Sequence, residues 1–496
     1  MKEKEPKFER LEIEEGKKNK ISKNKYDEII INKRFFFIKN HIIELLMLLF
    51  ISILLCLLMI ICFCYNIDEE AIKAQNDSNG LLNYSFGAIY KSDKENENIE
   101  LINKLDHEII EMIIDNKKIE PSLNYVFPNP GNHSVLVLIN ITNSTSLSYM
   151  FHDIINLLFI KFTSLFNTEN ITDMHNMFSG CVSLTSIDVS KFKTINVKDM
   201  NHMFANCSNL LSLNIKNFNT EKVFSINNMF YNCSKLTSID ISNFNTENVK
   251  SLKSLFHRCY SLKSADLFNF NTKNVIDMSY MFCSCFSLTS INMLSFDTFE
   301  VVSMKGMFSN CINLTSIDIT HFKTDKVIDM SFMFANCQKL TSIDVSHFNT
   351  QSVKYMNSMF ILCSSLNSIN LSNFNTKTTK NMNSMFSACT NLISINVSNF
   401  DTYNVVDMSY MFASCISLKS IDISNFVTLK LNDMNNLFNN CPQLSYIDMS
   451  SFIVNITSKI IISDFLYDVG TIKVTSDFFI KISHTIPPKW KTIIVN

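Results

Sequence analysis

The segment Cys181–Asn206 reads CVSLTSIDVSKFKTINVKDMNHMFAN, and variants of this 26-residue unit fill most of the chain. Phenylalanine recurs three residues before and eleven residues after each cysteine of the repeat. A fixed period of about 20–50 residues is typical of solenoid proteins, in which each unit packs only on its neighbours. The sequence therefore predicts one stack of units. The repeat cysteines are Cys181, Cys207, Cys233, Cys259, Cys285, Cys311, Cys337, Cys363, Cys389, Cys415 and Cys441.

The first half of each unit has the pattern of a short strand. Leu184, Ile187 and Val189 are spaced L-x-x-I-x-V, and the alternation of polar and apolar residues around Ile187 is typical of a half-buried strand. Phe192 follows where the chain must turn a corner. Stacked units would align these strands in a parallel sheet along one face of the solenoid.

The second half of each unit predicts a short helix. Thr194 is placed as a helix N-cap, and apolar residues then follow from Val197 to Cys207 at intervals of 3, 3, 1 and 3. Glycine or asparagine, which tolerate the left-handed conformation at a helix end, follows the phenylalanine of the predicted helix by two residues in six of eleven units. These residues are Gly180, Asn206, Asn232, Asn310, Asn336 and Asn440. The predicted fold class is an α/β solenoid of about 12 strand–helix units.

Two family resemblances follow from these motifs. The strand pattern L-x-x-[IL]-x-[VIL] followed by a helix resembles the leucine-rich repeat. The longer pattern C-x-x-L-T-S-I-D-[IV]-S-x-F-x-T-x-x-V-x-x-M-x-x-M-F resembles the BspA-like surface proteins of bacteria and some protists. A phenylalanine corner replaces the usual asparagine of leucine-rich repeats. The BspA-like resemblance implies a surface protein that attaches to host or matrix proteins.

The N-terminal part of the chain predicts a membrane anchor. Residues 1–41 hold 12 Lys/Arg and 8 Asp/Glu without a sustained period, as in a disordered tail. Residues 42–65 contain the uncharged 21-residue run Leu45–Tyr65, long enough to cross a bilayer as a helix. The basic residues gather on the N-terminal side of this run. The expected topology is a single-pass cell-membrane protein with a cytoplasmic N-terminus and extracellular repeats.

The remaining chain divides into three predicted regions. Residues 66–130 form a stalk with a short amphipathic helix, suggested by Ile102, Leu105, Ile109 and Met112, that either packs over the first repeat or pairs with a second copy. Residues 131–454 form the leucine-rich-repeat-like solenoid, with a divergent first unit at 146–173 and an alternating strand at 135–141. Residues 455–496 cap the stack, with a strand at 470–474 and Trp490 at the open end.

The cysteine column has two interpretations. Stacked units place neighbouring cysteines near bridging distance, and an extracellular location permits disulfides. Their inward position beside a helical phenylalanine instead favours a column of buried thiols. No cysteine pair has a histidine partner at zinc-ligand spacing, and no metal or cofactor is expected.

The sequence offers no sign of catalysis or of nucleic-acid binding. It contains no nucleophile elbow, phosphate-binding loop or zinc-protease motif. The net charge of −2 is too small to suggest a nucleic-acid partner. We therefore expect a protein that is not an enzyme.

One column on the strand face is acidic or amide in every unit. Its side chains alternate with the buried residues of the strand and so face solvent. They either form a hydrogen-bonded ladder between strands or present a polar binding surface, which could depend on cations. The acidic members of this candidate surface are Asp188, Asp240, Asp266, Asp318, Asp344, Asp422 and Asp448.

The repeat RCYSLKSADLFNF departs from the others. Phe268 and Leu294 replace the small hydroxyl residue that flanking units carry, and Arg258 and Tyr260 lie nearby in the sequence. Exposed apolar side chains on adjacent strands would make a candidate hot spot for a partner, although drift in a redundant array gives the same pattern.

Three functions remain open. The first is adhesion or recognition of an extracellular protein or glycan, which the BspA-like resemblance implies and the Phe268–Leu294 pair favours. The second is a structural coat or spacer, which the uniform exposed columns favour. The third is a scaffold of an internal membrane. The sequence does not indicate an oligomeric state.

Overall fold

The computed structural model describes residues 84–103, 108–141, 144–163, 166–453, 470–483, 486 and 488–495. The chain divides into two units, Met1–Phe63 and Cys64–Asn496, and every described residue belongs to the second. The predicted tail and the predicted span at 42–65 lie outside the described residues. Within the described ranges, no helix combines the length and the apolar character needed to cross a bilayer.

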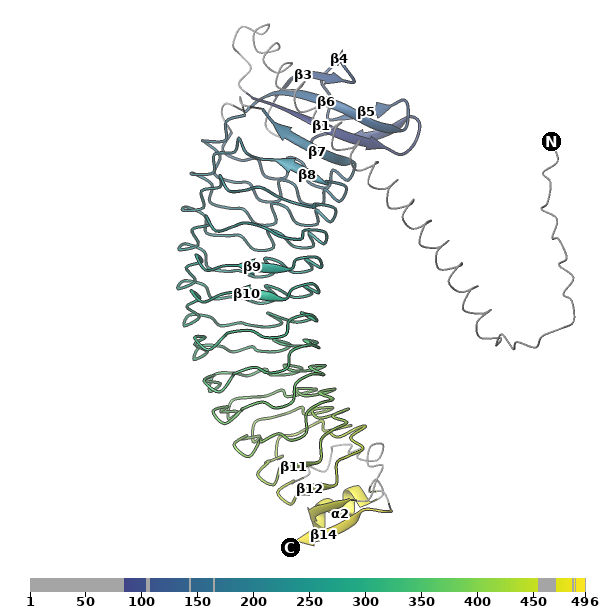
Figure 1. Ribbon diagram of the computed structural model, residues 1–496, viewed down its shortest axis with the longest axis vertical. Helices are drawn as coiled ribbons and strands as arrows, with labels where there is room; N and C mark the ends of the chain where they lie inside the picture. The colour runs from purple at the N-terminus through teal and green to yellow at the C-terminus, as the bar shows by residue number, and fades with distance from the viewer. Residues whose placement is uncertain are drawn as a thin grey trace, which may run out of the picture. The chain divides into compact units, whose positions relative to one another are not determined.

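Antiparallel strands precede the repeats (Figure 1). A six-stranded sheet has the order β4-β3-β6-β1-β7-β8, in which β7 and β8 are parallel. A separate antiparallel pair joins β2 to β5. The bounds are β1 Tyr84–Ser92, β2 Glu97–Glu100, β3 Glu108–Ile114, β4 Lys117–Ile119, β5 Asn124–Phe127, β6 Gly131–Asn140, β7 Leu157–Phe162 and β8 Ser186–Asp188.

This region contradicts the amphipathic helix predicted for the stalk. Ile109 and Met112 lie in strand β3, where they pair with Ile139 and Val137 of β6. Leu105 is outside the described residues. The run of β-branched isoleucines in EIIEMII favours a strand, and the neighbouring β6 supplies the partner that a sequence window cannot show. The alternating strand predicted at 135–141 is confirmed by β6.

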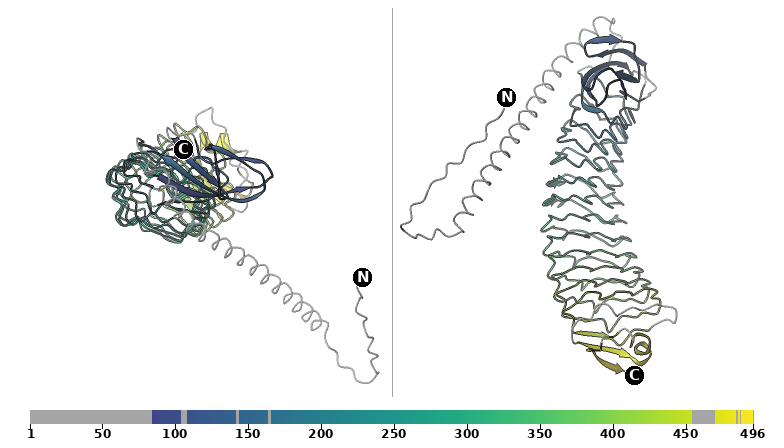
Figure 2. Two further views of the ribbon diagram at one scale, coloured as in Figure 1. Left: turned by 90° about the horizontal axis from the view of Figure 1, so that it is seen from above. Right: turned by 90° about the vertical axis from the view of Figure 1, so that its right-hand side faces the viewer.

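The 26-residue units form a stack of parallel coils, which lie side by side in both Figure 1 and Figure 2. One column of parallel bridges joins successive coils, for example Asp173 to Asp199 and Asp407 to Asp433. The predicted divergent first unit lies in this register, since Ser146 bridges to Asp173. On another side of the coils, some units contain the predicted short strands, which pair in parallel, whereas this segment forms no strand in the other described units. Among these strands, β9 Ser264–Asp266 pairs with β10 Ser290–Asn292, and β11 Ser420–Asp422 pairs with β12 Tyr446–Met449.

The predicted helix in each unit is wrong. The backbone N–H groups of Met200 and Phe204 donate to carbonyl groups of the next coil, Ser225 and Met229, both at 3.0 Å. The intervening Met203 donates to Met200 and closes a tight turn. Because alternate N–H groups leave the coil, no run of i to i−4 bonds can form. The 3, 3, 1, 3 spacing instead marks the inward-facing residues of successive turns.

Left-handed residues explain these turns. The six predicted glycine and asparagine positions all have positive φ, as expected, with Gly180 at 80° and Asn206 at 60°. A second left-handed position occurs four residues earlier in each coil and is occupied by residues such as His202, Tyr280 and Phe332. Two left-handed residues per coil interrupt any helix, so the repeat is a β-solenoid rather than an α/β solenoid.

Replacing Leu362 tests this backbone geometry. Leu362 has φ 60° in the column that asparagine occupies elsewhere, and it is 42% exposed, so little burial depends on it. A residue with a β-carbon loses roughly 1–2 kcal/mol of stability when its backbone adopts the left-handed conformation. Asparagine adopts this conformation more readily than leucine. Leu362→Asn is therefore expected to raise the free energy of unfolding in urea by about 1 kcal/mol. Leu362→Ala keeps the strain and is the control; equal stability of the two variants would contradict the geometry.

Columns of phenylalanine, cysteine and threonine side chains, which we call ladders because they repeat from coil to coil, fill the interior. Phe178 and Phe204 stack with ring centroids 5.7 Å apart, and Phe192 stacks on Phe218 at 6.4 Å. The eleven repeat cysteines are buried free thiols, as the second interpretation held. Each thiol also donates to a backbone carbonyl of the preceding coil, as Cys207 does to Phe178 at 3.1 Å.

The repeat threonines are not helix caps. The Thr194 hydroxyl donates to the carbonyl of Asn219 at 2.8 Å and accepts from the N–H of the same residue at 2.7 Å. Equivalent bonds to the next coil recur along the stack, and these threonines are buried. The hydroxyl thus satisfies backbone groups that the narrow coil cannot pair by itself.

The end of the described chain adds two strands and one helix. The bounds are β13 Thr471–Thr475, α2 Ser476–Ile482 and β14 Lys491–Val495. Strands β11, β12, β13 and β14 form one parallel sheet, which confirms the strand predicted at 470–474. Trp490 is buried, and its ring lies so close to Gly470 that a β-carbon there would meet it at 2.5 Å.

Candidate functional site

The acidic column of the strand face is held by local turns. In each of the seven predicted aspartates, Oδ1 accepts the backbone N–H of the residue two positions later, a pattern that aspartate favours after a strand. Asp240, Asp266, Asp318, Asp344 and Asp422 are exposed, Asp188 is half-buried and Asp448 is buried. A bond between neighbouring coils occurs where Asn292 donates to Asp266 at 2.9 Å. Turn capping therefore accounts for the column more fully than a ladder between strands.

Hydrogen bonds in these turns lower the pKa of several of the carboxylates. The Ser242 hydroxyl and then Lys216 lower the pKa of Asp240 to about 2. The Thr320 hydroxyl and backbone N–H lower the pKa of Asp318, and Ser346 does the same for Asp344. These three carboxylates thus carry negative charge at neutral pH.

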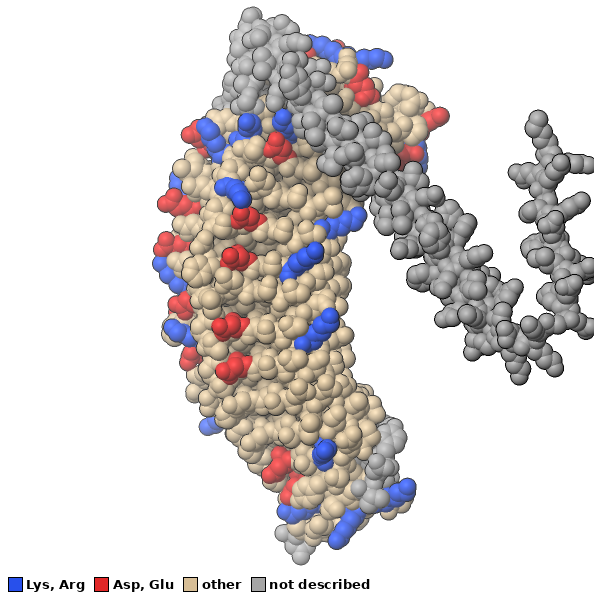
Figure 3. Space-filling model, viewed as in Figure 1, with Lys and Arg blue, Asp and Glu red and all other residues tan. Residues whose placement is uncertain are grey.

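A shallow polar groove crosses the strand face in the middle of the stack. Its volume is about 680 Å³, and its lining includes Asp318, Asp344 and Asn370 together with the serines of the neighbouring column. Acidic and basic side chains are sparse on the face seen in Figure 3, which is mostly uncharged. The groove can offer hydrogen bonds and two carboxylates to a ligand.

The candidate apolar residues fall into two places. Phe268 and Leu294 are 57% and 58% exposed and follow the paired residues Asp266 and Asn292 on adjacent strands. Tyr260 lies before β9, at its opposite end, and stacks on Phe286 with a centroid distance of 4.8 Å. The structure therefore brings Phe268 and Leu294 to neighbouring positions and sets Tyr260 apart from them.

Arg258 lies in an aromatic corner. Its guanidinium carbon is 5.8 Å from the ring centroid of Tyr231, which contacts His257 edge to face. His257 also stacks on Tyr280 at 5.8 Å. Burial and then Arg258 lower the pKa of His257 to about 4, so this histidine is neutral at physiological pH.

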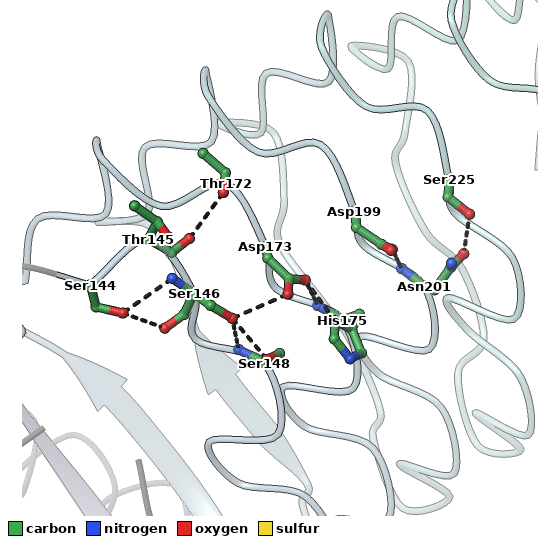
Figure 4. Close-up of polar contacts among 10 residues, drawn as sticks. All are labelled: Ser144, Thr145, Ser146, Ser148, Thr172, Asp173, His175, Asp199, Asn201 and Ser225. Carbon is green, nitrogen blue, oxygen red and sulfur yellow. Dashed lines mark hydrogen bonds and ion pairs between the residues drawn. The ribbon is translucent and has the colours of Figure 1, made fainter. Parts of the chain in front are cut away.

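Sequence reasoning missed a second polar column, which the bridge residues form (Figure 4). Asp173 Oδ1 accepts from the backbone N–H of His175 at 3.0 Å and contacts its Nδ1 at 2.7 Å. Asp199, on the next coil, accepts from the N–H of Asn201 at 2.8 Å. The recurring V-x-D-M of the repeat was the available signal, but this aspartate lies in the stretch that the sequence predicts to be a helix.

Comparisons with solved structures add little. A chain titled "Crystal structure of TLR13-ssRNA13 complex" matches with 13% identity and a TM-score of 0.21. The match covers 66% of this chain and spans about half the length of that one (50%). At that score the likeness supports no conclusion about this chain. No curated protein matches.

A family model matches the repeats. It covers residues 122–213, 208–314, 287–392 and 363–461, which together exceed half of the 496-residue chain. The family is described as "Mycoplasma protein of unknown function, DUF285". Its matched segments begin in the antiparallel strands and extend through the last complete coil. The chain belongs to the DUF285 family.

Proposed function

We propose that this protein is a membrane-anchored surface protein, without enzymatic activity, whose solenoid binds an extracellular protein or glycan. The uncharged run Leu45–Tyr65 supports the anchor, and the BspA-like repeat pattern supports the surface role. The solenoid supplies a rigid support, because each coil is joined to the next by repeated contacts. Threonine hydroxyls and cysteine thiols form hydrogen bonds with the backbone of the neighbouring coil, and phenylalanine rings stack on one another.

The observation that carries the proposal is the exposed pair Phe268 and Leu294. The same column holds Ser242 before them and Thr320 after them, so neither large side chain is needed for the turn. Both keep more than half of their surface in water, at 57% and 58%. Covering such side chains with a partner releases ordered water and contributes favourably to binding.

A double substitution tests this recognition surface. Phe268→Ser with Leu294→Ser is expected to weaken binding to immobilised matrix proteins or glycans by at least about tenfold, since apolar anchors dominate binding energy. Binding of the full chain to the panel is measured by biolayer interferometry, alongside the thermal midpoint, which should not fall.

Leu211→Ser with Ile393→Ser is the matched control. These two side chains are similarly exposed, at 55% and 52%, but lie on coils far apart in the stack. Their replacement should leave binding unchanged. Equal binding by the wild type and the Phe268/Leu294 variant would overturn the proposed surface.

A structural coat or spacer is the second candidate. The regular aspartate turns and the threonine ladder favour it, because these hydrogen bonds are made within the solenoid itself and need no ligand. In that case no member of the panel would bind the wild type. Location on an internal membrane, as a scaffold, remains a third proposal.

A further inference from the structure

We propose that Asp173, His175 and Asp199 bind one divalent transition-metal ion, such as Zn²⁺, between two adjacent coils. One ligand atom from each residue can be chosen so that all three lie within 4.8 Å of one another. All three residues are half-buried, so an ion there would be reachable from solvent and partly screened from it. This inference goes beyond the proposed recognition function and does not depend on it.

The donor set suits a transition metal. One imidazole and two carboxylates are ligands that Zn²⁺ takes, at about 2.0–2.2 Å, with a fourth position left for water. Ligand atoms around such an ion are separated by about 3–4 Å, so only small shifts of these side chains are needed for coordination. Imidazole also favours zinc, copper or nickel over calcium and magnesium, which prefer oxygen alone.

Neighbouring residues orient the ligands. Tyr149 contacts the His175 ring edge to face with a centroid distance of 4.8 Å. The Ser146 hydroxyl donates to Asp173 Oδ2 at 3.2 Å, and the N–H of Asn201 donates to Asp199 Oδ1 (Figure 4). Such outer contacts commonly fix the orientation of metal ligands. Coordination through His175 Nδ1 would replace its contact with Asp173 and leave the ring proton on Nε2.

The same chain contains a comparison site. Asp407 and Asp433 are bridged on adjacent coils as Asp173 and Asp199 are, but Ser409 stands in the column position of His175. The Ser409 hydroxyl donates to Asp407 at 2.6 Å. Asp407 and Asp433 therefore form a carboxylate pair without an imidazole and serve as a reference for metal binding. The metal ion should bind the cluster that contains His175 more tightly than the pair that lacks a histidine.

Titration of the full chain with Zn²⁺, after removal of metals with a chelator, tests the proposal. Because other histidines and cysteines can bind zinc, the readout is the difference between variants. His175→Asn, which copies Asn201 of the next coil, and Asp199→Asn should each remove one equivalent or weaken it at least about tenfold. Asp433→Asn should change neither stoichiometry nor affinity.

Cobalt absorption provides a second readout. Co²⁺ bound to the wild type should give the visible bands of nitrogen and oxygen coordination, and the His175→Asn spectrum should lack one equivalent of them. Circular dichroism confirms that each variant keeps its fold. Identical zinc stoichiometry and affinity in the wild type, His175→Asn and Asp199→Asn would overturn the site.

Discussion

Thr298→Val is expected to lower the free energy of unfolding by about 1–3 kcal/mol, because it removes the two hydrogen bonds that the buried Thr298 hydroxyl makes with the backbone of Lys323. Thr298 is fully buried, and its hydroxyl donates to the carbonyl of Lys323 at 2.8 Å and accepts from its N–H at 2.7 Å. Valine has nearly the same shape but no hydroxyl, so the loss isolates the hydrogen bonds from packing. Urea unfolding of the full chain, followed by circular dichroism, measures the change.

Two controls separate the ladder from other effects. Thr298→Ser keeps the hydroxyl and should cost much less than valine. Thr320→Val removes an exposed hydroxyl that bonds only within its own turn, to Asp318 at 2.7 Å, and should cost less than about 1 kcal/mol. If Thr298→Val and Thr298→Ser are equally stable, the hydroxyl does not support the stack.

The cysteine column is expected to make the solenoid sensitive to alkaline pH. Burial raises the pKa of Cys233 and of Cys363 to about 12, whereas a thiol in the unfolded chain titrates near about 8.5. Above about pH 8.5 the unfolded state therefore releases protons that the folded state retains. The contribution of the buried, protonated thiols to the free energy of unfolding is complete below this pH and is lost as the pH rises towards 12.

The size of this effect is large because the column repeats. Each buried thiol lowers the free energy of unfolding by up to about 1.4 kcal/mol per pH unit in that window. Replacing Cys233 and Cys363 by alanine should make the decline between about pH 9 and 11 shallower by up to about 3 kcal/mol per pH unit. Urea unfolding at a series of pH values measures the slopes. Identical slopes for the wild type and the double variant would contradict the protonated column.

Much of the stack could be predicted from sequence because the period fixes which residues are neighbours. The inward positions of Leu184, Val189, Phe204 and Cys207 are confirmed as buried. Asn206 was also correctly predicted to be left-handed. These features depend on the identity of single residues and on simple alternation.

The helix was mispredicted because turns and helices share a spacing. The second left-handed residue is a histidine in one coil and a phenylalanine in another, His202 and Phe332, so composition gives no sign of it. The role of Thr194 was missed because its partner is 25 residues away, on the next coil. Only the register between coils reveals such bonds.

The candidate sites show the same limit. Exposure of the Phe268–Leu294 pair followed from alternation along the strand, and the structure agrees. Distance along the chain suggested that Tyr260 would join them, but β9 lies between. The Asp173, His175 and Asp199 cluster was invisible because it is assembled across two coils from residues assigned to a helix.

Protease treatment of intact cells tests most directly whether the solenoid is displayed outside the cell. Antibodies against residues 1–41 and against the repeats follow the two parts of the chain. The proposed topology predicts that the repeats are cleaved while the tail stays protected until the membrane is opened. Protection of both parts in intact cells, and cleavage only after lysis, would contradict surface display and favour a scaffold on an internal membrane.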